Sequence, residues 1–349
     1  SIKYSKTRNF IKGAVTQLSP YISRGVIDTS TIINHLVKKG YTYFQSEKFI
    51  QQLLWREYFQ RVWMVKKELI NNDLKKNQEH VTNFQIPKAI INADTGIEAI
   101  DNGIRNVIAS GMMHNHLRMY VAFLSTNLGR SHWLHPAKWM YYYLLDGDWG
   151  SNALSWQWVA GTFSNKKYIA NQENINYYTC SNQHDTYIDV SYETLETMST
   201  PSQLLEYGLP ELTTNLPCTT AINIDISIPT LIYNYYNLSP VWKSEIQANR
   251  ILLLEPEIFQ DYPVADQCID FMLMLSKNIK NIQIFTGSFQ ELKSLLGHST
   301  IYYKEHPFNE HYEGIKDSRS WIVPDAATPT GSFFSFWKKN ENKLRKYFN

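Results

Sequence analysis

Apolar residues recur at helical spacing through the first half of the chain. Ser46 can cap a long helix that runs to about Asn71, in which Phe49, Leu53, Leu54 and Trp63 share one face. A shorter helix follows the N-cap candidates Asp28, Thr29 and Ser30 and ends near Gly40. We expect further helices at residues 95–109, 111–127, 136–147 and 151–161, and a loop at 72–94. The first half therefore predicts a helical domain.

The pattern changes in the second half. Short apolar runs at 250–255, 281–286 and 300–303 predict strands, and helical patterns occupy 265–277 and 288–296. Strands that alternate with helices indicate a small parallel sheet. We expect a helical domain at 1–180, an irregular linker region at 181–245 that contains at most short helical pieces, and a small α/β domain at 246–349. The fold class predicted is mainly α, with an all-helical domain first.

Composition limits the type of protein. The 349 residues are 43% hydrophobic and 14% aromatic, which suits two domains that hold an aromatic cofactor or stack bases, or simply an aromatic-rich core. The cysteines are three and scattered, without a CxxC pair, so we expect no disulfide framework, no metal site and a reduced, cytoplasmic setting. No apolar run predicts a membrane span or a signal peptide. Because the first residue is Ser1, the position of the native N-terminus stays open.

The net charge of +2 hides an asymmetry between the two halves. Residues 1–180 hold 21 Lys and Arg against 12 Asp and Glu, whereas the remainder holds 13 basic and 20 acidic residues. A basic first half suits a partner with a phosphate backbone, although a solvated surface can carry the same excess. We therefore expect DNA to contact the first half, and the acidic second half is a candidate surface for a protein partner.

Two stretches combine aromatic and polar residues in a way that suggests a ligand site. LLDGDWGSNALSWQWVAG, residues 144–161, carries two acids, an amide and three tryptophans, and SGMMHNHLRM, residues 110–119, lies one helix upstream. Apolar rings beside convergent polar groups are what a pocket for a large planar ligand requires. No G-x-G-x-x-G opens a strand–helix unit, so the sequence gives little support to a dinucleotide site in the second half.

These two stretches, together with QQLLWREYF at 51–59 and TRNFIKGAVTQLSPYISRG at 7–25, resemble the photolyase/cryptochrome family. The four matches occur in the family's order and span roughly residues 1–180. The resemblance implies an FAD-binding helical domain. Any α/β domain follows it here, whereas the family carries that domain first. This departure argues against the family's usual antenna chromophore.

The resemblance also implies which residues contact the flavin. Asn152 matches the position that faces flavin N5, Arg118 and Asp146 match a pair beside the ring, and Asp148 matches a position near the pyrimidine edge or the ribose. Thr16 and Ser19, at an expected helix start, match residues that hold the diphosphate. The complete implied set is Tyr4, Arg8, Thr16, Leu18, Ser19, Trp55, Asn115, Arg118, Asp146, Asp148 and Asn152. Taken singly, each residue also fits an ordinary capping or ion-pair role.

The same resemblance implies an electron route and a DNA-facing surface. Trp156 and Trp133 match the first two members of the family's tryptophan relay. The third is not visible where it is expected, since residues 74–92 contain no Trp, and Tyr141, Tyr142, Tyr143 and Trp139 are candidates to replace it. Trp156 and Trp133, together with Asn152, Gln52 and Trp55, form the implied catalytic set. Gln52, Trp55 and Arg56 share a helix face, where Trp55 can stack on a flipped-out base. The implied DNA-facing residues are Gln52, Trp55, Arg56, Met112, His116, Met119 and Trp158.

Three functions compete at this stage. The first is a light-driven DNA photolyase that splits pyrimidine dimers by electron transfer from FADH⁻. The second is a cryptochrome-like blue-light photoreceptor, which is favoured by Met112 where a Trp is usual and His116 where an Arg is usual. The third is a flavin-free scaffold, against which the intact Asn152, Arg118 and Asp146 set argues. The sequence does not distinguish a cyclobutane dimer from a (6-4) product.

Overall fold

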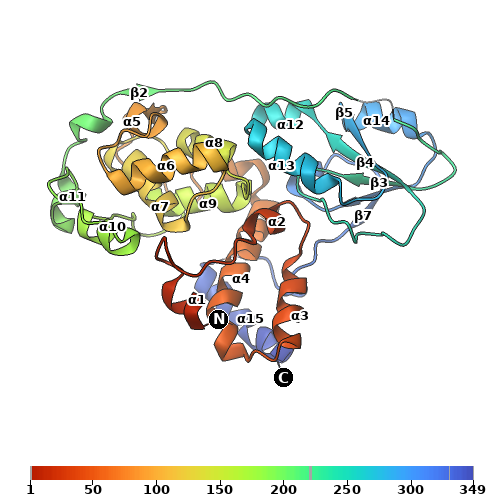
Figure 1. The fold of residues 1–349 in the computed structure, drawn as a ribbon, viewed down its shortest axis with the longest axis horizontal. Coiled ribbons are helices and arrows are strands. Elements are labelled where there is room, and N and C mark those ends of the chain that lie inside the picture. Colours follow the sequence, from red (N-terminus) through yellow and green to blue (C-terminus); the bar gives the residue numbers. More distant parts are fainter. Residues whose placement is uncertain (1, 220–221, 330, 349) are drawn as a thin grey trace. The chain divides into compact units, whose positions relative to one another are not determined.

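The computed structural model describes residues 2–219, 222–329 and 331–348, and about half of the chain is helical. The chain forms two compact units. The first comprises Ser1–Thr16, Gln45–Gln52 and Phe59–Glu211, and the second comprises Gln17–Phe44, Leu53–Tyr58 and Leu212–Asn349. The long helix α4 (Tyr43–Lys66) contributes residues to both (Figure 1).

The first unit is helical apart from one two-residue β-ladder. Its helices are α1 (Ile2–Thr7), α5 (Lys88–Ile91), α6 (Glu98–Ser110), α7 (Asn115–Phe123), α8 (Leu134–Tyr143), α9 (Trp149–Ala160), α10 (Gln172–Thr179) and α11 (Tyr192–Thr197). The ladder joins β1 (Ile86–Pro87) to β2 (Tyr207–Gly208) in antiparallel fashion. The expectation of an all-helical domain is therefore wrong at this ladder, because a two-residue strand leaves no periodicity in the sequence.

The core helices of this unit follow the sequence pattern, but several bounds differ from those predicted. Helix α8 ends at Tyr143, four residues before the predicted end, and α9 begins at Trp149, two residues before the predicted start. The helix predicted from residue 111 begins at Asn115, because Gly111 adopts a left-handed conformation (φ 72°) that ends α6 and His114 caps α7. A π-helical turn, Leu124–Leu128, then continues α7. Helices α7 and α8 both pack against α9. These contacts place the two aromatic-rich stretches in one helical layer.

The second unit contains the parallel sheet. Its strands are β3 (Thr230–Tyr233), β4 (Asn249–Leu254), β5 (Ile282–Thr286), β6 (Ile301–Lys304) and β7 (Ile315–Asp317), in the order β5-β4-β3-β6-β7. All neighbouring strands are parallel, which confirms the predicted strand direction. The helices of the unit are α2 (Ser19–Ser23), α3 (Thr29–Lys38), α12 (Pro256–Asp261), α13 (Asp266–Ser276), α14 (Phe289–Leu296) and α15 (Phe333–Arg345).

The centre of the sheet lies outside the region where strands were predicted. Strand β3 falls within 181–245, which we expected to be an irregular linker, and it pairs with both β4 and β6. Its four residues are fully buried and give too short an apolar run to stand out from its neighbours. The expectation of a linker is wrong at this strand. Where the domains begin and end otherwise remains a prediction.

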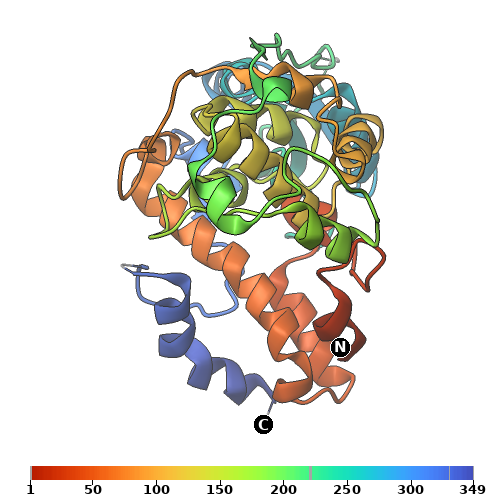
Figure 2. The same cartoon turned by 90° about the vertical axis from the view of Figure 1, so that its left-hand side faces the viewer.

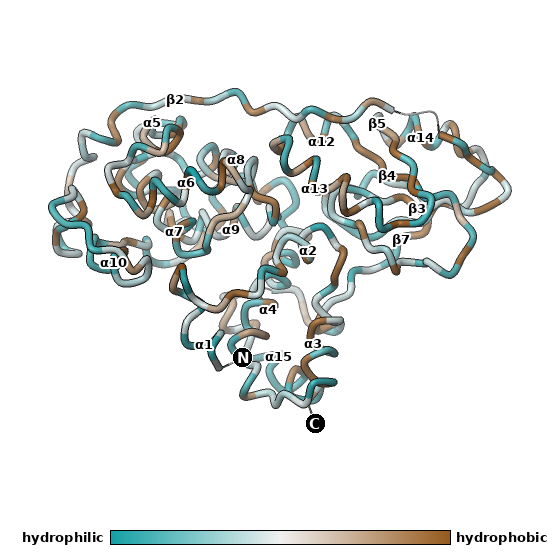
Figure 3. Tube along the Cα trace, in the orientation of Figure 1, coloured by the Kyte–Doolittle hydropathy of each residue, from teal (hydrophilic) through white to brown (hydrophobic). Residues whose placement is uncertain are grey.

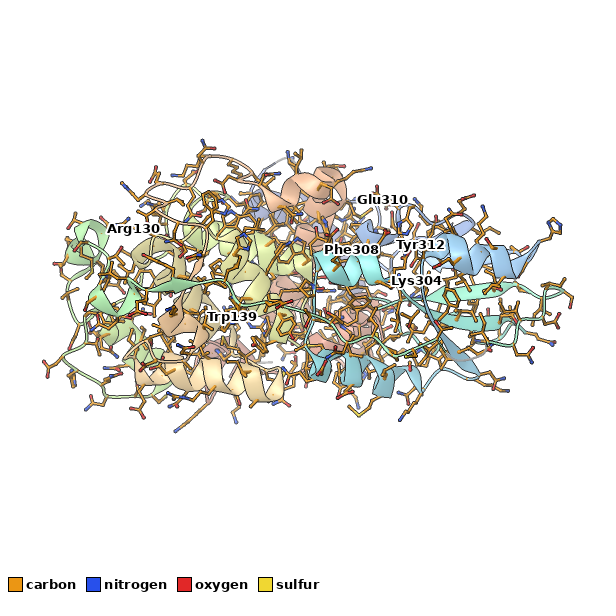
Figure 4. The ribbon with its side chains drawn as sticks, turned by 90° about the horizontal axis from the view of Figure 1, so that it is seen from above. Arg130, Trp139, Lys304, Phe308, Glu310 and Tyr312 are labelled. Atoms are coloured by element: carbon orange, nitrogen blue, oxygen red, sulfur yellow. The ribbon has the colours of Figure 1, made fainter. Side chains whose placement is uncertain are left out.

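Buried apolar side chains form the core of the sheet, and in Figure 3 hydrophobic residues (brown) follow strand β4. Polar residues at the carboxyl edge of the sheet, Glu255 and His306 among them, are also buried. Ile232, Leu253 and Phe285 pack against Phe289 and neighbouring side chains of α14. Glu255, directly after β4, is 7% exposed and accepts hydrogen bonds from the Tyr312 hydroxyl (2.8 Å) and the Phe289 backbone N–H (3.0 Å). These bonds satisfy a carboxylate that burial alone would destabilise. Figure 4 labels Tyr312 among the side chains of this unit.

Candidate functional site

An arginine–aspartate pair lies in the first unit, in front of α9. Arg118, on α7, donates from Nη2 to both carboxylate oxygens of Asp146, at 2.9 and 3.0 Å. Its Nε donates to the Met113 carbonyl at 2.9 Å, and the Asp146 side chain is only 8% exposed. The Nη1 group of Arg118 has no hydrogen-bond partner among the residues described. The pair expected from the sequence therefore forms, with one donor left for a ligand.

Asn152 lies on the first turn of α9 and is half-buried. Its Nδ2 donates to the Ala137 carbonyl of α8 at 2.8 Å. Its side-chain oxygen accepts no hydrogen bond in the described part of the chain. The amide is thus held in one orientation by α8 and keeps an acceptor available at the helix N-terminus, where the helix dipole favours negative charge.

Asp148 serves the helix itself. Its Oδ1 accepts from the Ser151 backbone N–H at 2.8 Å, which caps α9, and its Oδ2 accepts from Gln60 Nε2 of α4. The carboxylate is 3% exposed. The capping role that we considered for such residues therefore accounts for Asp148 within the protein. Its contact with a ribose or a pyrimidine edge remains a prediction.

The two tryptophans of the implied relay are both buried in the core of the first unit. Trp156 is 2% exposed on α9, and Trp133 is 0% exposed at the start of α8. The indole N–H of Trp133 donates to Asp73 Oδ1 at 2.7 Å. Burial fits both a packing role and a redox role, so the relay stays a prediction.

Arg8 and His116 lie close to His114 in the first unit. The Arg8 carbonyl lies 3.0 Å from His114 Nε2, and His114 Nδ1 accepts from the His116 backbone N–H at 3.2 Å. This arrangement uses both ring nitrogens of a neutral His114. The His116 ring packs on Tyr178, with 4.5 Å between ring centroids. Burial, together with the charges of His114 and Arg8, lowers the pKa of His116 to about 4.

We expect this cluster to make the protein acid-sensitive. Burial also lowers the pKa of His114, so the folded chain binds fewer protons than the unfolded chain below pH ~6.5. Stability should therefore be complete above this pH and should decline as the pH falls toward about 4. The loss attributable to His116 should be about 1–2 kcal/mol, less than the whole shift because water reaches part of the ring.

Urea unfolding at a series of pH values measures this effect. His116→Gln should flatten the decline, because the substituted side chain does not titrate in this range. His184→Gln is the control, since His184 is 62% exposed and should leave the profile unchanged. Identical pH profiles for the parent and His116→Gln would contradict the assignment.

The residues expected at the diphosphate divide between the units. Tyr4 and Thr16 belong to the first unit, where Tyr4 packs edge-on against Phe49 at 5.2 Å. Leu18 and Ser19 belong to the second. Ser19 begins α2 as predicted, but this helix has only five residues and Leu18 offers no side-chain cap. The diphosphate role of these residues remains a prediction.

Trp55 is covered on one face by the C-terminal helix of its own unit. Its ring stacks on Phe333 of α15 with centroids 3.7 Å apart and planes at 13°. In Figure 2 the C-terminal helix α15 (blue) lies beside the long helix α4 (orange). The adjacent Tyr58 hydroxyl donates to the Gly331 carbonyl at 2.7 Å. On the same helix, Gln52 is exposed and Arg56 is half-buried. The ring face that we expected to receive a base is thus occupied by Phe333 in this structure.

The remaining residues expected to face DNA lie at or near the surface of the first unit. Trp158 is 39% exposed and packs against Tyr168 at 5.7 Å. Met112 and Met119 are half-buried. Because these side chains are accessible, they could contact DNA. Their role in DNA binding remains a prediction. Asn115, which was expected to contact the flavin instead, is also exposed.

The sequence did not single out three residues that hold these elements together. Gln60 binds Asp148, Asp73 binds Trp133, and Glu57 accepts from the Ile322 backbone N–H at 2.6 Å. Glu57 lies inside the QQLLWREYF stretch, and an acid among apolar positions was the available signal. Asp73 lies in a polar loop, where nothing in the sequence sets it apart.

Comparison with known proteins agrees with this geometry. Residues 49–195 match the family described as the FAD binding domain of DNA photolyase. A deoxyribodipyrimidine photo-lyase of Alkalihalophilus pseudofirmus is 27% identical over 45% of this chain and 34% of its own length. A cryptochrome DASH of Danio rerio is 32% identical over 45% of this chain and 32% of its own length. Residues 49–195 are therefore similar to the FAD binding domain of the photolyase/cryptochrome family.

The matches cover only part of each protein. The chain spans about a third of the length of these curated relatives. A class III photolyase structure from Agrobacterium tumefaciens is 30% identical, with a TM-score of 0.38 over 45% of this chain and 34% of that one. Among the described residues, no helix has the length and apolarity to cross a membrane.

Proposed function

We propose that the first unit binds FAD beside α7 and α9 and that the protein is a light-driven DNA photolyase that splits pyrimidine dimers. The proposal depends on the Arg118–Asp146 pair and on Asn152, which lie on or beside the packed helices α7 and α9 in a stretch that matches a photolyase FAD binding domain. The available Nη1 donor and amide oxygen suit the polar edge of an isoalloxazine ring. When bound, the reduced flavin supplies an excited-state electron that opens the dimer and then returns.

The protein's own residues bind and orient. Asp146 holds the Arg118 guanidinium in place by two hydrogen bonds, so its free donor has a fixed direction. The positive charge of the Arg118 guanidinium and the N-terminus of α9 both favour a flavin ring that carries negative charge. Asn152 can accept a hydrogen bond from a ring N–H through its free oxygen. These groups would stabilise a reduced, anionic flavin over the oxidised one.

Damaged DNA is the proposed substrate, and α4 is its proposed contact. Gln52 is exposed and Arg56 is partly exposed on this helix, and the excess of basic residues before residue 180 suits a phosphate backbone. Stacking of a base on Trp55 would require Phe333 to leave the ring. Lesion binding and a movement of α15 are therefore coupled in this proposal.

A cryptochrome-like photoreceptor without repair activity is the second candidate. The stacking of Phe333 on Trp55 favours it, because this contact closes the ring face that repair would use. Such a protein would bind the same flavin and would change its redox state in light. The flavin site is compatible with both functions. Repair of lesion-containing DNA in light therefore distinguishes them.

A visible spectrum of the purified protein, followed by illumination with DNA, tests the proposal. We expect a yellow protein with one FAD per chain that restores duplexes containing either a cyclobutane dimer or a (6-4) product. Trp156→Phe should keep its flavin and should be reduced more slowly in light. A flavin-containing protein that leaves both lesions intact would favour the photoreceptor, and a colourless protein would overturn both candidates.

A further inference from the structure

Asp73 binds the indole of Trp133 through a charged hydrogen bond. Trp133 Nε1 donates to Asp73 Oδ1 at 2.7 Å, and the indole is 0% exposed. The other oxygen of Asp73 accepts from the Gln78 backbone N–H at 2.7 Å, and Gln78 Oε1 accepts from the Trp133 backbone N–H at 2.9 Å. The loop that follows α4 thus engages both donors of this residue.

The carboxylate remains ionised at neutral pH. Burial raises the pKa of Asp73, but hydrogen bonds from His132, Gln78 and Trp133 outweigh burial and leave this pKa below its ordinary value. His132 Nε2 lies 3.3 Å from Oδ1, and both side chains are 15% exposed. His132 Nδ1 accepts from the Leu134 backbone N–H, so a neutral ring that donates through Nε2 satisfies both contacts. A negative charge is therefore held against the indole N–H.

No residue in this loop can readily donate an electron to an oxidised Trp133. Residues 74–92 contain neither Trp nor Tyr. The ring that stacks on His132 is Phe84, at 5.1 Å, and a phenylalanine is much harder to oxidise than an indole. Once Trp133 is oxidised, the loop at 74–92 offers no residue that would reduce it more easily. The lifetime of the Trp133 radical therefore depends on the surroundings of Trp133 itself.

We propose that Asp73 is a positioning residue that makes Trp133 easier to oxidise, so that the electron hole stays on Trp133. This inference rests on the proposed function and on the implied relay, in which Trp156 would pass an electron to a photoexcited, oxidised flavin when one is bound. One electron leaves Trp133 and no bond breaks, so the indole becomes a radical cation that still shares its proton with Asp73. The adjacent carboxylate stabilises this cation, and in a buried setting the attraction is stronger than in water. Trp133 is thereby easier to oxidise than a tryptophan without such a partner.

The substitution Asp73→Asn tests the charge while it keeps a hydrogen-bond acceptor of the same shape. In transient absorption of the flavin-loaded protein, we expect the tryptophan radical of this variant to decay at least several-fold faster than in the parent. Trp133→Phe should remove the long-lived radical. Asp94→Asn, at an exposed carboxylate of the same unit, is the matched control and should decay like the parent.

A second measurement needs no flavin. In ¹⁵N spectra of the apoprotein, the indole N–H resonance that disappears in Trp133→Phe should move upfield in Asp73→Asn, because a neutral acceptor binds the proton more weakly. Unchanged radical decay in Asp73→Asn would overturn the inference and leave the proposed function intact. An unchanged radical in Trp133→Phe would also overturn it, and a protein that binds no flavin would overturn the inference and the proposed function together.

Discussion

Replacing Arg118 with Ala is expected to lower the free energy of unfolding by about 3 kcal/mol and to abolish flavin binding. The reason for the first effect is that Asp146, whose side chain is 8% exposed, would be a buried carboxylate without the two hydrogen bonds that Arg118 donates to it. The reason for the second is that Arg118 provides the donor proposed for the ring. Urea unfolding and the flavin absorbance per chain measure the two effects separately.

A double substitution separates the structural role of the pair from its ligand role. Arg118→Met combined with Asp146→Leu replaces a partly buried ion pair by apolar side chains of similar size, which often costs little stability. We expect unfolding energies close to those of the parent, and still no flavin. Full flavin occupancy in the double variant would contradict the site, whereas equal instability of both variants would contradict the electrostatic explanation.

Replacing Phe333 with Ala is expected to cost about 3 kcal/mol of stability, because Phe333 is 2% exposed and packs against both Trp55 and Tyr58. Iodide should then quench the Trp55 fluorescence more strongly, and this signal is identified by its loss in Trp55→Phe. If the photolyase proposal holds, the affinity for lesion-containing DNA should rise relative to that for undamaged DNA, since the ring face becomes available.

Phe334 provides the matched control. It is the same residue type at the next position of α15, its side chain is 60% exposed, and it meets the Trp55 ring only edge-on, with 6.3 Å between centroids. Phe334→Ala should change stability by less than about 0.5 kcal/mol and should leave quenching near the parent level. Similar losses for the two variants would mean that general weakening of α15, and not the stack on Trp55, explains the result.

The helices around the site were predictable because each carries a strong local signal. Asp28 before α3 was predicted as an N-cap, and its side chain accepts the Thr31 backbone N–H. Asp148 caps α9 in the same way, although we predicted that this helix begins at residue 151 and expected another role for Asp148. The Arg118–Asp146 contact was also expected, although only from the family resemblance. Periodicity and capping are local properties, so a single sequence reveals them.

The parts that could not be predicted depend on contacts between distant segments. Strand β3 is stabilised by pairing with β6, about seventy residues later, and its own four residues carry little pattern. The stack of Phe333 on Trp55 joins opposite ends of the chain. Asp73 acquires its partner only when its loop meets the start of α8. Such pairings follow from tertiary structure, which the local pattern does not encode.

The division of α4 has a consequence for how this protein can be altered. Its residues Leu53–Tyr58 belong to one compact unit, while the helical residues on either side belong to the other. Leu54 and Tyr58 are 0% and 1% exposed. An exchange of either half for a homologous one would therefore have to preserve the middle turns of this helix. Because α4 contributes residues to both units, neither unit can be exchanged by itself without a change in this helix.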